Sequence, residues 1–264
     1  MARHTLLFEG ARRLIRNEET LTSIDSLAFF NNKGGVGKTT LACNMAASIA
    51  SLAHYRVLMI DCDPQCNATQ LLLSEDQWET VYGNRRDSQR RTIMRVLRHI
   101  RAGDSDIDTN LDIVRSKRFK LDVIPGHPSL SMVEDHLSAS WIDFRGGDPG
   151  GARRSMWASR LVNSASDYDL VVFDVGPSLG ALNRCVLLGS DRFVTPMAAD
   201  LFSLYALDNI SEWIRSWSKD YRRGYEAIVE RSEIEPEEWG IESRPRTAPG
   251  TPPSMKAAAE RQDR

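Results

Sequence analysis

The sequence predicts an α/β fold with a mostly parallel central sheet covered by helices on both faces. Two observations lead to this fold class. Short apolar runs typical of buried strands recur along the 264 residues and end at glycine, proline or aspartate, and stretches with helical spacing separate them. Because parallel strands are joined by crossovers long enough to hold a helix, this alternation indicates a parallel sheet.

The composition excludes several classes of protein. With 41% hydrophobic residues, 27% charged residues and a net charge of −2, the chain is typical of globular proteins, so any basic surface must be local. No apolar run approaches the roughly 20 residues that span a bilayer, so we expect a cytoplasmic protein with no membrane partner. Cys43, Cys62, Cys66 and Cys185 lack the spacing of a disulfide framework, and the Cys62/Cys66 pair, which could be half of a metal site, has no second ligand pair, so free thiols are favoured.

The first elements can be followed along the chain. Residues 1–25 alternate basic and apolar positions and are expected to form an amphipathic arm. The main domain, residues 26–240, opens with the apolar run "SLAFFNN", a predicted strand, and continues through glycines into a predicted helix over residues 39–53. Alanines on that helix would let it lie close to the sheet. Four later runs predict strands: "YRVLMIDCDPQ", "LDVIPGHPSL", "YDLVVFDVGPSLG" and "SDRFVTPMAAD".

A long polar insertion, residues 74–120, separates the second and third predicted strands. Its centre, "RRTIMRVLRHIRAG", predicts one amphipathic basic helix with apolar residues on one side and arginines toward the other. Two interpretations remain open. The arginines form either a solvated face over a packed apolar stripe or a contact with the phosphate backbone of a nucleic acid. The arginines are Arg91, Arg95, Arg98 and Arg101.

The last third of the chain changes character twice. The segment "ARRSMWASRLVNS" predicts the crossover helix that leads into the fourth strand. Beyond Pro196, apolar residues from Leu204 to Ile228 recur at steps of three and four, which predicts one long helix, with a possible break near Gly224. No further apolar strand follows. Residues 241–264 are rich in proline, small residues and charges, and we expect a disordered tail.

The segment "NNKGGVGKTTLAC" carries the strongest chemical signal. Glycines after a buried strand can turn backbone N–H groups around an anion, and the following helix N-terminus adds its dipole. Lys38 is placed to reach the β- and γ-phosphates of a nucleotide, and the Thr39 hydroxyl to bind Mg²⁺. The usual pattern is G-x-x-x-x-G-K-[ST]. Here Asn32 stands at the first glycine position, and Lys33 is an additional lysine.

Three aspartates end two of the predicted strands. In a parallel α/β sheet, ligands bind beyond the carboxyl ends of the strands, where Asp61, Asp63 and Asp174 would converge. A magnesium-triphosphate site needs a carboxylate near the metal and a group that orients the attacking water. Asp174 suits the metal role, with Asp61 as a second candidate, and Asp63 suits the water role.

Three motifs in order, "KGGVGKTT", "DCDPQCNAT" and "DLVVFDVGPSLG", resemble the deviant Walker A, Walker A′ and Walker B/switch segments of the ParA/Soj/MinD family of P-loop ATPases. The resemblance implies a three-layer P-loop NTPase fold with a mostly parallel central sheet, shortened here at its C-terminal end. It also implies ATP and Mg²⁺ as cofactors and Lys33, Lys38 and Asp63 as catalytic residues. The implied nucleotide-binding residues are Lys33, Gly34, Gly35, Val36, Gly37, Lys38, Thr39 and Thr40.

In this family the residue matching Lys33 is a signature lysine that reaches the partner subunit's phosphates in an ATP-bound homodimer. The resemblance implies slow ATP hydrolysis, DNA binding without sequence preference, and stimulation by a ParB-like protein. The protein would partition plasmids or chromosomes, or position cargo, and would associate with the nucleoid when ATP-bound. Candidate DNA contacts are Arg91, Arg95, Arg98, Arg101, Arg222 and Arg223.

Two departures from the family pattern support an alternative. The family's switch usually has the pattern D-x-P-P, whereas Val175-Gly176-Pro177 follows Asp174 here, which should loosen the turn. The strands expected after Pro196 are not evident. The alternative is therefore a nucleotide-holding interaction protein of the same fold with little or no ATP turnover.

Overall fold

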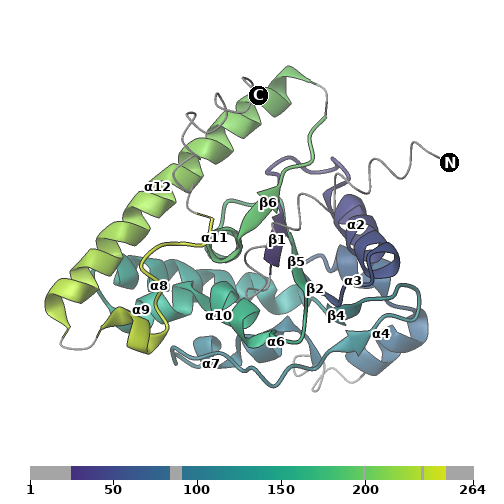
Figure 1. Cartoon of the computed structure of the whole chain (residues 1–264), viewed down its shortest axis with the longest axis horizontal. Helices are drawn as coiled ribbons and strands as arrows, with labels where there is room; N and C mark the ends of the chain where they lie inside the picture. The colour runs from purple at the N-terminus through teal and green to yellow at the C-terminus, as the bar shows by residue number, and fades with distance from the viewer. Residues whose placement is uncertain (1–24, 84–90, 199, 233–234, 248–264) are drawn as a thin grey trace, which may run out of the picture.

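A six-stranded sheet forms the centre of the molecule (Figure 1). The structure is a computed structural model, and it describes residues 25–83, 91–198, 200–232 and 235–247. The arm predicted for residues 1–25 therefore lies, except for Asp25, outside the described residues. The strands are β1 Asp25–Phe29, β2 Val57–Cys62, β3 Val114–Arg115, β4 Asp122–Ile124, β5 Leu170–Val175 and β6 Arg192–Val194.

The strands lie in the order β3-β4-β2-β5-β1-β6, and only the β3–β4 pair is antiparallel. The predicted α/β class with a mostly parallel sheet is confirmed. Asp61 at the end of β2 pairs in register with Asp174 of β5, so the two carboxylate-bearing strands end side by side. All five predicted strands are present. The two-residue β3 was not predicted, because such a short segment leaves no periodic pattern.

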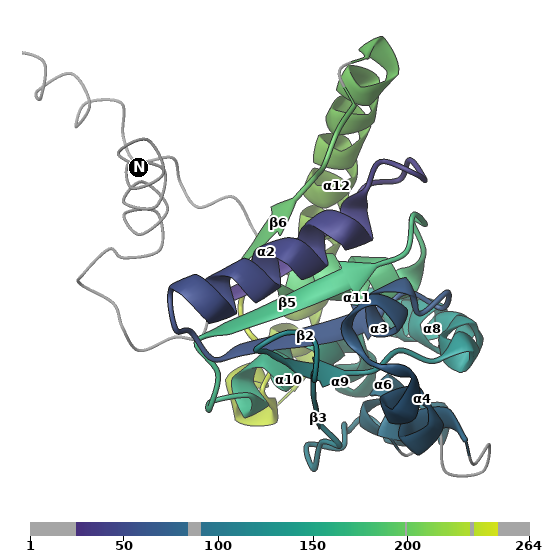
Figure 2. The ribbon, with the colours of Figure 1, turned by 90° about the vertical axis from the view of Figure 1, so that its right-hand side faces the viewer.

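Helices cover both faces of the sheet (Figure 2). Alternate residues of each strand point to opposite faces, so Phe29 and Met59 enter one core while Ala28 and Ile60 enter the other. The helices are α2 Lys38–Leu52, α3 Asn67–Leu72, α4 Glu75–Tyr82, α6 Ile93–Val96, α7 Arg98–Arg101, η2 Pro128–Val133, α8 Glu134–Arg145, α9 Pro149–Ser155, α10 Trp157–Ser164, α11 Ala181–Gly189, α12 Leu201–Arg231 and η3 Pro236–Trp239.

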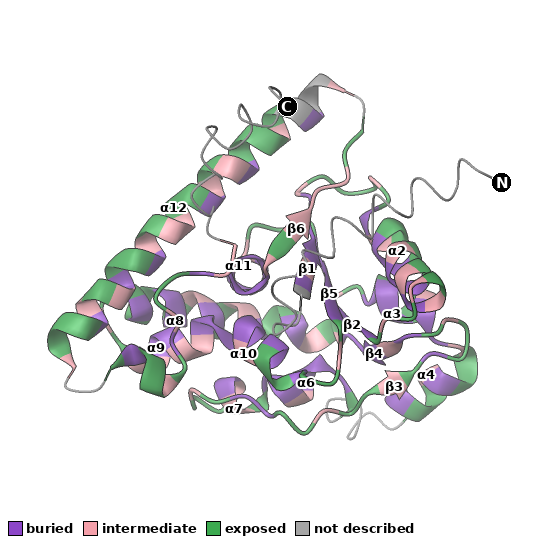
Figure 3. Cartoon of the chain, viewed as in Figure 1, coloured by how far each residue is buried: buried purple, intermediate pink, exposed green. Residues whose placement is uncertain are grey.

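The two helical layers differ in size. Helices α2, α3 and α4 pack on one face, where small residues such as Ala42 and Ala46 let α2 approach the strands. Helices α6, α8, α10 and α11, with part of α12, pack on the other face. Figure 3 shows the buried strands between the two layers and the exposed outer side of α12. Within the described residues, no helix is long and apolar enough to cross a membrane.

The insertion is more integrated into the fold than the sequence indicates. The single basic helix predicted over its centre is instead two four-residue helices, α6 and α7, which meet at Leu97. Ile93, Val96 and Ile100 are buried in the main core, so the apolar stripe was correctly identified. The sequence does not reveal the interruption, because Leu97 keeps the apolar spacing of a helix while its backbone leaves the helical region.

The long helix α12 does not break at Gly224, contrary to the expectation. It runs for 31 residues from Leu201 to Arg231. A Cβ atom at position 224 would lie 2.7 Å from the Phe144 carbonyl oxygen of α8. Glycine is therefore present because two helices touch at this point, and its low helix propensity is outweighed by that contact.

The start of the predicted disordered tail is ordered. Ile241 is buried, the Tyr221 hydroxyl donates to the Glu242 carbonyl oxygen at 2.6 Å, and the Arg246 backbone N–H donates to the Leu188 carbonyl oxygen at 3.0 Å. The Arg246 guanidinium also lies 3.3 Å from Asp191. These contacts pin residues 241–247 to the domain, although the composition of the segment resembles that of a disordered chain. Residues 248–264 of the expected tail lie outside the described residues.

Candidate functional site

The phosphate loop, residues 30–37, connects β1 to α2 beyond the carboxyl end of the sheet. Gly35 and Gly37 have φ angles of 75° and 77°, in the left-handed region that glycine adopts most readily. The buried Asn31 side chain braces the loop, since its Oδ1 accepts from the Lys33 backbone N–H at 2.8 Å and its Nδ2 donates to the Pro196 carbonyl oxygen at 2.6 Å. The loop is thereby tied to the segment that follows β6.

Lys38, Thr39 and Asp174 form a compact polar group at the start of α2. The Lys38 ammonium donates to Asp174 Oδ1 at 2.7 Å, and the Thr39 hydroxyl donates to Asp174 Oδ2, also at 2.7 Å. Asp174 is fully buried and Lys38 is 8% exposed. Burial raises the pKa of the Asp174 carboxyl, while the bonds from Lys38 and Thr39 oppose that shift. The residues proposed for phosphate and metal binding are thus in direct contact.

Asp61 lies beside this group, but its carboxylate is hydrogen-bonded to the residues that follow its own strand. Its carboxylate accepts from the Asp63 N–H at 3.1 Å, the Thr69 N–H at 2.8 Å and the Thr69 hydroxyl at 2.6 Å. Burial raises the pKa of Asp61 to about 7, although the hydrogen bonds from Thr69 lower it. A Cβ at Gly126 would lie 2.9 Å from the Asp61 carboxyl carbon, so the segment after β4 also packs against this side chain.

Asp63 faces the open side of the site. It lines the same pocket as the phosphate loop, and its Oδ1 accepts from the Gln65 N–H at 2.9 Å. A Cβ at Gly176, in the segment after β5, would lie 3.5 Å from Asp63 Oδ1, which is ordinary contact distance. Asp63, in the segment after β2, therefore lies against the segment that follows β5.

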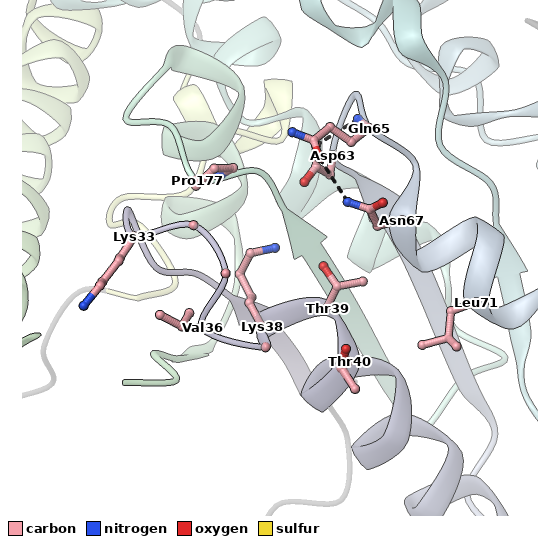
Figure 4. A pocket seen from close by; sticks show the side chains of 13 residues that line it. Lys33, Val36, Lys38, Thr39, Thr40, Asp63, Gln65, Asn67, Leu71 and Pro177 are labelled. Carbon is pink, nitrogen blue, oxygen red and sulfur yellow. Dashed lines mark hydrogen bonds between the residues drawn. The ribbon is translucent and has the colours of Figure 1, made fainter. Parts of the chain in front are cut away.

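Lys33 lies on the opposite side of the loop from Lys38, and its side chain points away from the Lys38 ammonium (Figure 4). Its Nζ lies 2.8 Å from Asp200 Oδ2. Asp200 is the N-cap of α12, where its Oδ1 accepts from the Ser203 N–H at 2.8 Å. Both side chains of the ion pair remain substantially exposed, at 43% for Lys33 and 37% for Asp200.

The pocket between these segments has a volume of about 550 Å³. The implied nucleotide-binding residues 33–40 all line it, together with four residues that sequence reasoning did not assign to the site. Leu71 and Asn67 both come from α3 and lie one helical turn apart. This spacing, in the helix that follows the aspartates, is a signal by which both could be predicted. The four are Gln65, Asn67, Leu71 and Pro177.

The candidate DNA-binding arginines fall into two groups. In the insertion, Arg95 lies 3.2 Å from Asp108 and 2.9 Å from Asp112, and Arg98 lies 3.0 Å from Asp108. The Arg91 guanidinium donates to the Thr80 carbonyl oxygen at 2.5 Å. By contrast, Arg222 and Arg223 on α12 are exposed and form no ion pair with any described residue. Neither group lies at the phosphate pocket.

The four cysteines are buried and free. Burial raises the pKa of Cys66 to about 12 and that of Cys185 to about 12 as well. Both thiols are therefore protonated at neutral pH and are poor nucleophiles and poor metal ligands.

The chemistry that the site can perform follows from these groups. Left-handed glycines, open space above Gly34, Gly35 and Gly37, and the N-terminus of α2 form an anion-binding cradle. One buried ammonium, one hydroxyl and one buried carboxylate meet at its base. This donor set matches a polyphosphate together with a hard divalent cation.

Known proteins resemble the chain over most of its length. Residues 24–226 match the AAA_31 family model, described as an AAA domain. The virulence plasmid ParA family protein pGP5-D of Chlamydia psittaci is 32% identical over 189 residues, covering 71% of this chain and 62% of that protein. The sporulation initiation inhibitor protein Soj of Bacillus subtilis is 31% identical over 192 residues, covering 72% and 64%. The matches thus span less than two thirds of these curated relatives.

A solved structure extends the similarity to three dimensions. Protein DIP2308 from Corynebacterium diphtheriae has 43% sequence identity and a TM-score of 0.77, covering 83% of this chain and 74% of that one.

Proposed function

The chain belongs to the AAA_31 family of AAA domains and is a ParA/MinD-type P-loop ATPase by family, and from that premise we propose that it hydrolyses ATP slowly with Mg²⁺, dimerises on ATP and binds DNA without sequence preference. A ParB-like protein would stimulate hydrolysis, and the cycle would serve plasmid or chromosome partitioning or cargo positioning. We place the protein in the cytoplasm, on the nucleoid when ATP-bound.

The contact of Lys38 and Thr39 with Asp174 carries the proposal. Desolvation makes a buried ammonium–carboxylate pair a poor source of stability, which favours a functional role, and here the pair lies at the base of a glycine loop. When a triphosphate enters, Lys38 would exchange one Asp174 oxygen for phosphate oxygens. Thr39 and Asp174 would hold Mg²⁺, which supplies neutralisation of the phosphate charge.

Asp63 is proposed to orient the attacking water. It is the one carboxylate of the three that faces the pocket with an oxygen not tied into a strand end, whereas Asp61 makes three bonds within its own motif. Asp63→Ala should retain nucleotide binding and lose hydrolysis by about 100-fold or more, as expected for a residue that positions a reacting group. Hydrolysis at the wild-type rate in this variant would refute the role.

Lys33 is proposed to act in the partner subunit's site. Its side chain points away from Lys38 and lies 43% exposed, so it is available to a second copy of the chain once it leaves Asp200. Two facing triphosphates repel each other, and a cation supplied by the opposite subunit would offset that repulsion.

For DNA we favour α12 over the insertion. Arg95 and Arg98 are neutralised by Asp108 and Asp112, and binding phosphates would require these ion pairs to break. By contrast, four cations of α12 lie on neighbouring turns of the helix, are exposed and form no ion pair with any described residue. We define the α12 stripe as Arg215, Lys219, Arg222 and Arg223.

Size-exclusion chromatography of the protein without nucleotide, with ADP and with Mg²⁺-ATP tests the proposal first. A dimer only with ATP is expected.

The α12 stripe is tested by a DNA-binding assay. The triple variant Arg215→Glu, Lys219→Glu and Arg222→Glu should lose ATP-dependent DNA binding. The control variant Arg95→Glu with Arg98→Glu should keep it. Because each phosphate contact releases counterions, binding should also weaken steeply with salt.

A turnover assay with DNA and a ParB-like protein separates the two candidate functions. ATP hydrolysis that rises with these additions supports the switch. Tight nucleotide binding without turnover under every condition would instead establish the nucleotide-holding interaction protein.

A further inference from the structure

We propose that Glu134, the first residue of α8, is a positioning residue that holds the switch segment and couples it to α12. This inference rests on the proposed function, since it concerns how the nucleotide site acts on the rest of the chain. The switch segment is defined as residues 176–180, between β5 and α11. Pro177 of this segment lines the nucleotide pocket, and Gly176 lies against Asp63.

The start of α11, directly after the switch segment, is held by Glu134, which lies 47 positions before Ala181 in the sequence. Glu134 Oε2 accepts from the Leu182 N–H at 3.1 Å, and Glu134 Oε1 accepts from the Ala181 N–H. These are the first N–H groups of α11, which have no partner inside the helix. A carboxylate there also interacts favourably with the helix dipole. The α11 N-terminus is thus capped from another helix instead of by a residue of its own.

Gly180 is required by the same contact. A Cβ at this position would collide with the Glu134 carboxylate, while the backbone of Gly180 has φ −69°, which any residue can adopt. Glycine is therefore present because Glu134 approaches so closely. Glu134 and Gly180 are distant in the sequence, and both are needed for this one contact. Its geometry therefore tolerates little change.

The near end of the switch segment is held by α11. The buried Asn183 side chain donates to the Gly176 carbonyl oxygen at 2.7 Å and to the Ser178 carbonyl oxygen at 2.7 Å. The segment and the first turn of α11 therefore form one unit. Since Glu134 contacts this unit at Ala181 and Leu182, a shift of Pro177 in the pocket is passed to α8.

Helix α8 connects this unit to α12. The Phe144 ring meets Tyr221 edge-on at a centroid distance of 5.0 Å, and Phe144 also occupies the space above Gly224. A second contact joins α8 to α11, because the Arg184 guanidinium lies 4.5 Å from the centre of the Trp141 ring. The path therefore runs from the pocket through the switch segment and Glu134 to the helix that carries the α12 stripe. This path predicts that a change at Glu134 alters the response of α8 to nucleotide, which can be tested directly.

Hydrogen exchange of the full chain provides that test, with Glu134→Gln compared with Asp135→Asn. Asp135 is the exposed neighbour in the same first turn of α8, so its variant removes the same charge from the same helix start. Without nucleotide, Glu134→Gln should speed exchange in residues 176–182 by about two- to five-fold, since a carboxylate at a helix N-terminus contributes this much. Asp135→Asn should behave as the wild type.

Addition of Mg²⁺ with a non-hydrolysable ATP analogue tests the coupling. In the wild type, protection should appear in residues 31–40, in the switch segment and in α8. In Glu134→Gln it should persist in residues 31–40 and no longer reach α8. Gly180→Ala, which displaces the same carboxylate sterically, should reproduce this pattern, and the double variant should add nothing further because both changes remove one contact.

Three results decide the matter. Exchange in Glu134→Gln that equals the wild type, or that Asp135→Asn also shows, overturns the positioning role. Protection of α8 that persists in Glu134→Gln overturns the coupling. If the analogue protects nothing in the wild type, nucleotide binding and the coupling both fail, and the nucleotide-free comparison still decides whether Glu134 holds the switch segment.

Discussion

The two lysines at the phosphate loop occupy opposite environments only five residues apart. Lys38 is 8% exposed and is bound to a fully buried carboxylate, whereas Lys33 pairs with Asp200 in a contact open to water. A buried charge without a partner costs several kcal/mol, roughly 3 to 5, while an exposed ion pair contributes about 0 to 1 kcal/mol. Lys38 is therefore committed to one place, and Lys33 can leave its partner with little loss.

Lys38→Ala should have the largest effect of any change at the loop. It removes the cation proposed to bind phosphate and leaves Asp174 buried with only Thr39 as a partner. We expect nucleotide affinity to fall by about 100-fold or more, with a loss of about 3 kcal/mol in the free energy of unfolding. Titration with a fluorescent ATP analogue and denaturant unfolding measure the two effects. Affinity within threefold of the wild type would show that Lys38 is not the phosphate ligand.

Lys33→Ala should impair a different property of the protein from Lys38→Ala. The monomer should keep its nucleotide affinity and should lose no more than about 0.5 kcal/mol of stability, because the Lys33 ion pair is exposed. ATP-dependent dimerisation should weaken by about 30-fold or more, as for a cation removed from an interface. Sedimentation across a concentration series gives the dimer affinity. A dimer of normal affinity would contradict the role assigned to Lys33 in the partner's site.

The contribution of the buried Asp61 to the stability of the fold should also depend on pH. Burial raises the pKa of Asp61 to about 7 in the folded chain, against an ordinary value of 3.8. The folded state then binds more protons than the unfolded state between these values, so the contribution of Asp61 to stability is fully present below about pH 4 and declines up to about pH 7. Asp61→Asn should flatten this decline in unfolding experiments. The exposed Asp167→Asn should not, and an unchanged slope in Asp61→Asn would contradict the assignment.

Asp200→Asn should have the smallest effect. Asparagine still caps α12, so the fold should persist, and the ion pair with Lys33 is lost. Nucleotide-free Lys33 should become about two- to five-fold more reactive toward an amine-modifying reagent, in keeping with the strength of an exposed pair. Mass spectrometry of the modified peptide, with the Lys38 peptide as an internal reference, provides the measurement. Equal reactivity in both proteins would show that Asp200 does not restrain Lys33.

The features that could be predicted from sequence are local ones. The contact of Lys38 and Thr39 with Asp174 could be anticipated, because a strand, a glycine loop and a helix start leave a continuous pattern and Asp174 ends a later buried strand of the same sheet. The contacts of Glu134 with α11 and of Asp200 with Lys33 join residues far apart in the chain, and no spacing records them. Gly224 shows the same limit, since its reason lies in Phe144 on another helix.

The length of α12 gives this molecule the mechanics of a lever. Ile214 is buried in the main core and acts as the pivot. Gly224 lies 10 residues, about 15 Å, to one side of it, and Asp200 lies 14 residues, about 21 Å, to the other, at about 1.5 Å per residue. A tilt of about 5° at Ile214 would displace Asp200 by roughly 2 Å, enough to separate a hydrogen-bonded pair. A small shift between α8 and α12 at Gly224 would thus become a larger displacement of Asp200, at the loop that carries Lys33.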